Sequence, residues 1–158
     1  MTKTELLEAY KTGKRNFTNI DLRGVDLSGV DLSDIFMSGA NLSEANLSHA
    51  NLSRAIFSKS EFSFASLTGA NLTGAKLVDD NNLFGADLSG ANLSGAILAL
   101  ANLSRANLSR ANLTNTTLDG ANLSRANFSY IKLSGTSLTG ADLSGANLEG
   151  TNWYDVSY

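Results

Sequence analysis

The chain has 158 residues, about the length of one domain, with 12 basic and 15 acidic side chains and a net charge of −3. It contains no proline, no cysteine and one histidine, which excludes a disulfide framework and a cysteine-based metal site. The mild charge favours neither a broad cationic nucleic-acid surface nor a strongly acidic one. Neither a signal-peptide pattern nor a long apolar span occurs, which predicts a cytoplasmic protein that does not enter a membrane.

The first predicted element is a short amphipathic helix over residues 4–12. Leu6, Leu7 and Tyr10 would share one side of this helix, and Gly13 is a typical stop signal. A stacked repeat protein exposes its core at both ends unless these ends are covered. We therefore assign residues 1–14 to an N-terminal capping helix.

After the helix, a large apolar residue recurs at every fifth position from Phe17 to Trp153, apart from one six-residue step between Leu77 and Leu83. The 28 central residues comprise 22 Leu, four Phe, one Met and one Trp. A period of five forms no stripe on an α-helix and sends alternate side chains to opposite faces of a flat strand. All central residues share one core only if the backbone turns a corner in every repeat, which predicts a solenoid over residues 15–155.

The remaining positions of the repeat support this reading. Ala usually stands two residues before the central one, Asn or Asp directly before it, Ser or Thr directly after it, and often Gly next. Ala is small enough to point inward, whereas Asn, Asp and Gly favour turns. The run ANLSR at 101–105, repeated at 106–110, resembles the motif A(D/N)LXX of the pentapeptide-repeat family over about 140 residues. The resemblance implies an all-β solenoid, a right-handed quadrilateral parallel β-helix with four repeats per coil.

Sorting the repeats into four classes by taking every fourth one tests the number per coil. Asn or Asp precedes the central residue in 18 of 21 cases in three classes, but once in seven in the class that begins with Phe17. This class stays in phase across the six-residue step, which predicts an outward bulge near Asp80. Four repeats per coil give about seven coils and a length of roughly 34 Å at ~4.8 Å per coil.

The last aromatic residues have two interpretations. Trp153, Tyr154, Val156 and Tyr158 either cover the C-terminal end of the solenoid or form a dimer contact there, and self-capping is favoured slightly. Residues 156–158 are assigned as a C-terminal tail. The predicted oligomeric state is a monomer or a weak dimer through one end.

The sequence indicates no catalytic, cofactor or metal site, and we predict that the protein is not an enzyme. The single imidazole, His49, falls at an outward position, and the many Ser occupy a position that the repeat defines. The carboxylates Asp21, Asp26 and Asp31 should lie on three neighbouring faces of the first coil and, with Asp34, form an acidic end, for which turn formation is the better interpretation than paired acid–base chemistry.

Two surface features are candidate binding sites. The first is a partner-binding strip on the unusual class, made of Phe36, Ile56, Val78, Ile97 and Leu100, with ordinary strand packing as the alternative. The second is a basic patch in which Arg105 and Arg125 stack one coil apart and Arg110 lies on the adjoining face. Such a patch suits nucleic acid or an acidic partner, although a solvated surface is the better interpretation and no nucleic acid is expected.

The favoured function is a structural or protein-interaction module with a rigid repetitive surface and an unknown protein partner. The arrangement resembles the small stand-alone pentapeptide-repeat proteins of cyanobacteria, whose biochemical roles are mostly undefined. One alternative is a DNA-mimic regulator of the quinolone-resistance type that binds DNA gyrase, against which the weak net charge and the three arginines argue. Ice or surface binding ranks last, because the threonines form no full column.

Overall fold

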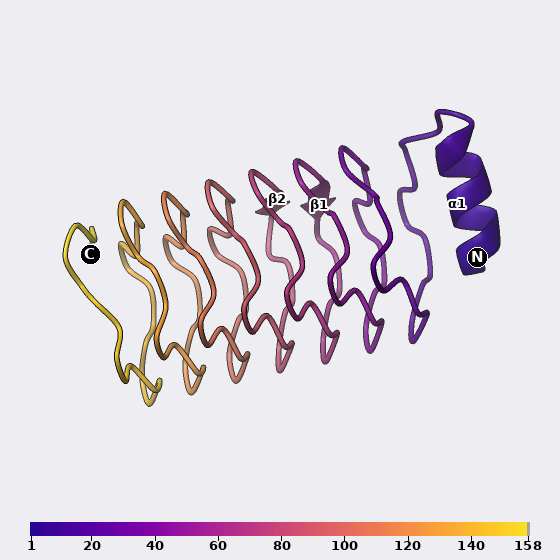
Figure 1. Cartoon of the computed structure of the whole chain (residues 1–158). Coiled ribbons are helices and arrows are strands. Elements are labelled where there is room, and N and C mark those ends of the chain that lie inside the picture. Colours follow the sequence, from indigo (N-terminus) through magenta and orange to yellow (C-terminus); the bar gives the residue numbers. More distant parts are fainter. Residues whose placement is uncertain (158) are drawn as a thin grey trace.

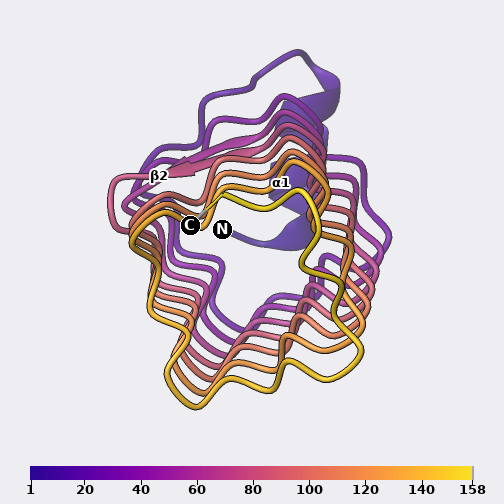
Figure 2. The ribbon, with the colours of Figure 1, turned by 90° about the vertical axis from the view of Figure 1, so that its left-hand side faces the viewer.

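A computed structural model describes residues 1–157 of the chain. Helix α1 (Lys3–Lys11) lies across one end of a stack of coils, and two short strands, β1 (Ile56–Ser58) and β2 (Lys76–Val78), lie in successive coils (Figure 1). The strands pair in parallel, with Ile56 opposite Lys76. Viewed along the stack, the coils superimpose on one another (Figure 2), so the architecture is a β-solenoid with an N-terminal helix.

Single parallel bridges join each coil to the next along four lines, which we call ladders 1 to 4. They start at Asn16, Asp21, Asp26 and Asp31, respectively, and hold the residue that directly precedes each central one. Bridged residues are 20 positions apart, as in Asn16 with Phe36, or 21 apart where they span the six-residue step, so four repeats separate consecutive members of a ladder. Ladder 1 belongs to the class of repeats that begins with Phe17, in which Asn or Asp rarely precedes the central residue.

Each pentapeptide turns at the residue two after its central one. This turn residue has a positive φ in almost every repeat, for example 62° at Gly24 and 59° at Arg105. Asn or Asp supports the turn from the ladder position, because its side-chain oxygen accepts the backbone N–H two residues on, as Asn41 Oδ1 does from Ser43 at 3.1 Å. The sequence therefore specifies a corner every five residues.

Asparagine side chains also tie successive coils together. Asn127 Nδ2 donates to Asn107 Oδ1 at 3.1 Å, and Asn107 Nδ2 donates to Asp87 Oδ1 at 3.1 Å, along ladder 3. Ladder 4 contains similar bonds, such as Asn71 to Asn51 at 3.0 Å. The Asn side chain therefore both accepts a hydrogen bond within its own turn and donates one to the preceding coil. This second bond explains why Asn recurs at positions where any turn-forming residue could support the turn.

The centre of the solenoid is filled with apolar side chains. From Leu22 to Leu138 every central residue is at most 2% exposed, and the alanines two residues earlier are buried beside them in most coils. Phe57 and Phe62 pack edge to face with ring centroids 4.9 Å apart. Burying one such side chain contributes about 1.5–3 kcal/mol, so the repeated column is the main source of stability.

The six-residue step is accommodated as an outward bulge, as predicted. Asp79 and Asp80 are exposed and adopt consecutive positive φ values of 58° and 61°. The ladders remain in phase, since Glu61 bridges Asn82 and Lys76 bridges Ile97. Sequence analysis missed the role of Asn81, which stands where Ala is usual and is completely buried.

The amide of Asn81 is inserted into a turn of the preceding coil. In a regular coil that turn closes directly, as in Ala40 N–H to Met37 O at 3.1 Å. Here Ser60 N–H donates to Asn81 Oδ1 at 2.9 Å and Asn81 Nδ2 donates to Phe57 O at 3.0 Å. Because buried backbone groups are costly when unpaired, Asn81 is what makes the bulge compatible with the core.

Helix α1 confirms the predicted N-terminal helix, with bounds one residue earlier than expected. Thr2 and Glu5 form a capping box at its start, and Gly13 (φ 95°) follows its last turn. Leu6 is completely buried against the core, while the Tyr10 hydroxyl donates to the Ser33 carbonyl at 2.7 Å. The helix therefore lies against the N-terminal coils, as Figure 1 shows.

At the other end, the aromatic residues differ in environment. The Trp153 ring stacks on Phe128 at a centroid distance of 6.3 Å, and Val156 is partly buried against the core. Tyr154 is 84% exposed, and Tyr158 lies outside the described residues. Trp153 and Val156 thus pack against the preceding coils, whereas Tyr154 points to solvent.

Candidate functional site

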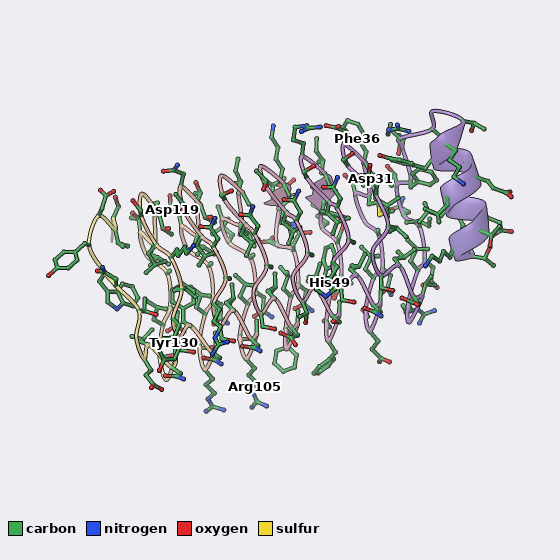
Figure 3. All side chains as sticks on the ribbon, in the orientation of Figure 1. Asp31, Phe36, His49, Arg105, Asp119 and Tyr130 are labelled. Atoms are coloured by element: carbon green, nitrogen blue, oxygen red, sulfur yellow. The ribbon has the colours of Figure 1, made fainter. Side chains whose placement is uncertain are left out.

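Three members of the predicted strip lie in ladder 1. Phe36, Ile56 and Ile97 occupy its bridged positions, with Lys76 between the two isoleucines. Phe36 is 45% exposed and labelled on the upper side of the solenoid in Figure 3, while both isoleucines are half-buried. The apolar row is therefore interrupted by one exposed cation.

The other two predicted members lie beside ladder 1. Val78 is the last residue of β2 and pairs with Ser58, whereas Leu100 is a turn residue (φ 62°) that is 62% exposed. We call these five residues, Phe36, Ile56, Val78, Ile97 and Leu100, the ladder 1 strip; the exposed Lys76 lies between Ile56 and Ile97.

The predicted basic residues are turn residues on both edges of ladder 3. Arg105 and Arg125 belong to one turn column, since Arg105 N–H donates to Ser124 O and Arg125 N–H to Ser144 O in the following coils. Arg110 lies at the next turn along the chain. All three side chains are exposed, and Arg105 projects from the lower edge of the solenoid in Figure 3.

Exposed aromatic rings accompany these arginines, which sequence analysis missed. Phe64 is 61% exposed and meets Phe84 edge to face at 5.3 Å, and the Arg105 guanidinium lies 5.8 Å from the Phe84 ring centroid. Tyr130 follows Arg110 by one coil and is 53% exposed. The signal was present, because Phe84 stands where the repeat usually has Ser and Phe64 and Tyr130 stand where it often has Gly.

The Tyr130 hydroxyl donates to Glu149 Oε1 at 2.6 Å. This hydrogen bond, with the charge of the same carboxylate, raises the pKa of Tyr130 above its ordinary value. A shallow hollow of about 470 Å³ lies on ladder 3 beside the turn column of Arg110 and Tyr130. It is lined by Ser89, Gly90, Asn107, Ser109, Arg110, Asn127, Ser129 and Tyr130.

Bulky turn residues lean onto a glycine in the following coil. A Cβ on Gly85 would lie 2.8 Å from the Phe64 ring, and one on Gly150 would lie 2.4 Å from the Tyr130 ring. The same relation joins His49 to Gly69 at 2.7 Å. Glycine is therefore needed at these turns for space as well as for its φ.

We expect Gly85→Ala to destabilise the protein more than Gly90→Ala. Both glycines have nearly the same φ, 64° and 65°, so alanine costs roughly 1 kcal/mol of backbone strain at either. Only at Gly85 does the new methyl group displace Phe64 from Phe84, which costs about a further 0.5–1 kcal/mol, because nothing lies within 4 Å at Gly90. Urea unfolding gives the free energy of unfolding of both variants. Equal losses of stability would contradict the packing of the Phe64 ring on Gly85.

The acidic residues of the first coil serve turns and ion pairs. Asp21 pairs with Arg23 at 2.8 Å and Asp34 with Arg54 at 2.6 Å, and the hydrogen bond from each arginine lowers the pKa of its partner carboxyl. Asp31 Oδ1 accepts from the Ser33 amide and from Asn51 Nδ2. These partners account for the carboxylates without acid–base chemistry.

The role of the Asp26 carboxylate in its turn can be tested through its pKa. Its Oδ1 accepts the Ser28 N–H at 3.0 Å, and this backbone hydrogen bond lowers the pKa of Asp26 below its ordinary value of 3.8. The folded-state pKa is thus below the unfolded one, so the stabilisation is complete above the unfolded value and is lost as pH falls through the folded pKa. A carboxyl ¹³C titration should show a pKa below 3.8, and Asp26→Asn should keep the turn without the pH dependence. A pKa at or above 3.8 would exclude this role.

The described part of the chain brings together no candidate group of metal ligands. His49 is an exposed turn residue with φ 57°. Within residues 1–157, no group of three or more His, Cys, Asp or Glu could hold a metal ion, and no helix there is long and apolar enough to cross a bilayer. The strip, the arginines and the aromatic rings are consequently the surface features that remain as candidates.

The fold is a β-solenoid in which each pentapeptide pairs with the one four repeats further along the chain. The family model for pentapeptide repeats matches eight copies, at residues 16–39, 37–74, 82–120 and 121–152. The chain therefore belongs to the pentapeptide-repeat family. None of the curated protein sequences compared with this chain matches it.

Solved structures of several pentapeptide-repeat proteins are similar. Rfr23 from the cyanobacterium Cyanothece 51142 is 23% identical, with 98% of each chain covered and a TM-score of 0.60. Full-length QnrB1, a plasmid-mediated fluoroquinolone resistance protein, is 21% identical, with 85% of this chain and 82% of QnrB1 covered and a TM-score of 0.56. HetL from the cyanobacterium Nostoc sp. strain PCC 7120, which is involved in heterocyst differentiation regulation, is 30% identical over 99% of this chain and 94% of HetL, with a TM-score of 0.31.

Proposed function

We propose that this protein is a non-enzymatic interaction module whose rigid surface holds side chains at fixed spacing for a protein partner. The observation that carries the proposal is the filled core, in which the central residues from Leu22 to Leu138 are at most 2% exposed. A filled solenoid leaves recognition to its outer surface, and repeat proteins commonly use extended surfaces in this way. The cytoplasmic location is part of the proposal, and cell fractionation tests it.

The proposed architecture is a right-handed quadrilateral β-helix of about seven coils. It is supported by the four ladders and by the spacing of 20 residues between bridged positions. The proposed division is a capping helix over residues 1–14, the solenoid over 15–155 and a tail over 156–158. The protein would be a monomer or a weak dimer through one end, which light scattering of wild type and Tyr154→Ser distinguishes.

The ladder 1 strip is the proposed partner-binding surface, and a double substitution tests it. We expect Ile56→Ser with Ile97→Ser to weaken capture of the partner from native lysate, because half-buried apolar side chains are lost from the strip. Stability should change little, since ladder 1 already accepts Ser137 and Thr117. Glu61→Ser with Lys132→Ser changes two exposed positions of ladders 2 and 4 and is the matched control. Undiminished capture by the Ile56/Ile97 variant would eliminate the strip.

DNA gyrase binding is the alternative function. The similarity of QnrB1, named as a fluoroquinolone resistance protein, keeps this alternative open, whereas the net charge of −3 and the exposed arginines oppose mimicry of DNA. Dose-dependent inhibition of gyrase supercoiling, or protection of gyrase from a quinolone, would favour the alternative. Ice binding ranks last, because the threonines form no full column and hydroxyls such as those of Thr73 and Thr114 already donate to Asn Oδ1 at 2.6 and 2.7 Å. A thermal-hysteresis measurement tests it.

A further inference from the structure

The arginines of the C-terminal half differ from those of the N-terminal half in their partners. Arg23 and Arg54 each form an ion pair with an aspartate. Among residues 1–157 no carboxylate lies within ion-pair distance of Arg105, Arg110 or Arg125. Arg105 and Arg125 are moreover neighbours in one turn column, where like charges repel each other. Ion pairing within the solenoid therefore does not account for this cluster.

The cluster lies beside exposed aromatic rings. Phe64 and Phe84 precede Arg105 in the same edge of the solenoid, and the Arg105 guanidinium lies 5.8 Å from the Phe84 ring centroid. Across ladder 3, Arg110 and Tyr130 line the shallow hollow. Arginine and aromatic side chains contribute most of the binding energy at many protein interfaces. This combination indicates a surface for both charged and apolar groups of one ligand.

Carboxylates border this surface at both ends, and one more, Asp87, lies on ladder 3 in the coil of Phe84, where its Oδ1 accepts from Asn107 Nδ2 at 3.1 Å. Glu44 is one coil before Phe64 in the same turn column, and Glu61 stands beside it on ladder 2. Asp142 and Glu149 follow on the C-terminal side. The positive surface spans only two coils, roughly 10 Å at ~4.8 Å per coil, so a long polyanion would meet negative charge beyond it. A short acidic segment fits these limits, whereas a nucleic acid strand does not.

We propose that Arg105, Arg110 and Arg125 form, with Phe64 and Phe84, a docking site for a short acidic protein segment. Carboxylates of the segment contact the arginines, and an apolar side chain of the segment contacts the phenylalanine rings one or two coils away, roughly 5–10 Å along the solenoid. The inference rests on the proposed function as an interaction module. It assigns a second surface that lies apart from the ladder 1 strip.

Selection from a random peptide display library on the immobilised full chain tests the proposal. We expect the selected peptides to be enriched in Asp and Glu together with an aromatic or aliphatic residue. Their affinity, measured by fluorescence anisotropy, should fall about tenfold with Arg105→Gly, Arg110→Gly and Arg125→Gly combined, and should weaken with added salt. Glycine suits these turns because Gly85, Gly145, Gly90 and Gly150 occupy the same columns with positive φ.

The matched control removes the same number of positive charges elsewhere. Lys59→Gly and Lys132→Asn place at each site a residue type found in its own column, Lys11→Gln removes an exposed charge from helix α1, and this triple variant should bind within about twofold of wild type. Circular dichroism verifies that both variants fold. Peptides without acidic enrichment, or with equal affinity for the triple arginine variant, would overturn the proposal.

Three further outcomes separate this inference from the proposed function. Selected peptides that are released by Ile56→Ser with Ile97→Ser, and not by the arginine variant, would overturn the docking site while supporting the interaction module. Tighter binding of a ten-nucleotide single-stranded DNA than of any selected peptide would also overturn it and identify a nucleic-acid surface. A selection without any binder overturns the docking site, and partner capture then decides the proposed function alone.

Discussion

Replacing Leu108 by Asp should unfold the whole solenoid in one cooperative transition. Leu108 is a fully buried central residue, and its carboxylate replacement would have no cation or hydrogen-bond donor within the apolar column. An uncompensated buried charge costs about 3–5 kcal/mol, a large share of the 5–15 kcal/mol by which domains are typically stable. Because each coil packs on both neighbours, the loss cannot remain confined to one repeat.

Far-ultraviolet circular dichroism and thermal unfolding measure this result. Ser109→Asp is the matched control, because it places the same charge one residue later on the half-exposed outer surface and should retain the wild-type spectrum. Leu108→Phe is a second control for size, since Phe128 fills the equivalent position in the next coil. A Leu108→Asp protein with an unchanged β spectrum and melting temperature would refute the inward orientation of the central residues.

Asn81→Ala should be the second most destabilising change, by about 2–4 kcal/mol. The substitution removes the amide between Ser60 N–H and Phe57 O and leaves both backbone groups buried without that partner. It also removes the bond to the Val78 carbonyl at 2.5 Å, which closes the bulge. Each orphaned buried group costs about 1–3 kcal/mol. Urea unfolding gives the magnitude.

A compensating deletion makes the Asn81 prediction specific. Deleting Asp80 together with Asn81→Ala restores uniform five-residue spacing, and the turn from Phe57 to Ser60 is then free to close directly, as Ala40 N–H does to Met37 O at 3.1 Å. We expect the double change to recover much of the stability lost by Asn81→Ala. If the deletion adds to the loss, the amide does not act as a substitute for the regular turn bond.

The sequence predicted those features that repeat every five residues. The central Leu column, the inward Ala and the turn-forming Asn are each defined by local spacing, and the unusual composition around Phe36 and Ile56 identified ladder 1. The bulge at Asp80 followed from one extra residue. These features are local, so periodicity alone was sufficient to locate them.

Features that depend on residues 20 apart were harder to predict. The contact between Phe64 and Phe84, the nesting of Phe64 on Gly85 and the insertion of Asn81 into the preceding coil all join neighbouring coils. Pentapeptide spacing does not specify in which direction an exposed side chain leans along the stack.

The nesting of turn residues on glycines limits how coils can be recombined. A 20-residue coil exchanged for another would preserve the central column, yet it would separate Phe64 from Gly85 or Tyr130 from Gly150 if the boundary fell between them. Grafting a bulky ligand-binding residue onto a turn therefore requires a glycine at the next turn of that column. Pairs of turn residues in successive coils, and not single pentapeptides, are the units in which this surface can be redesigned.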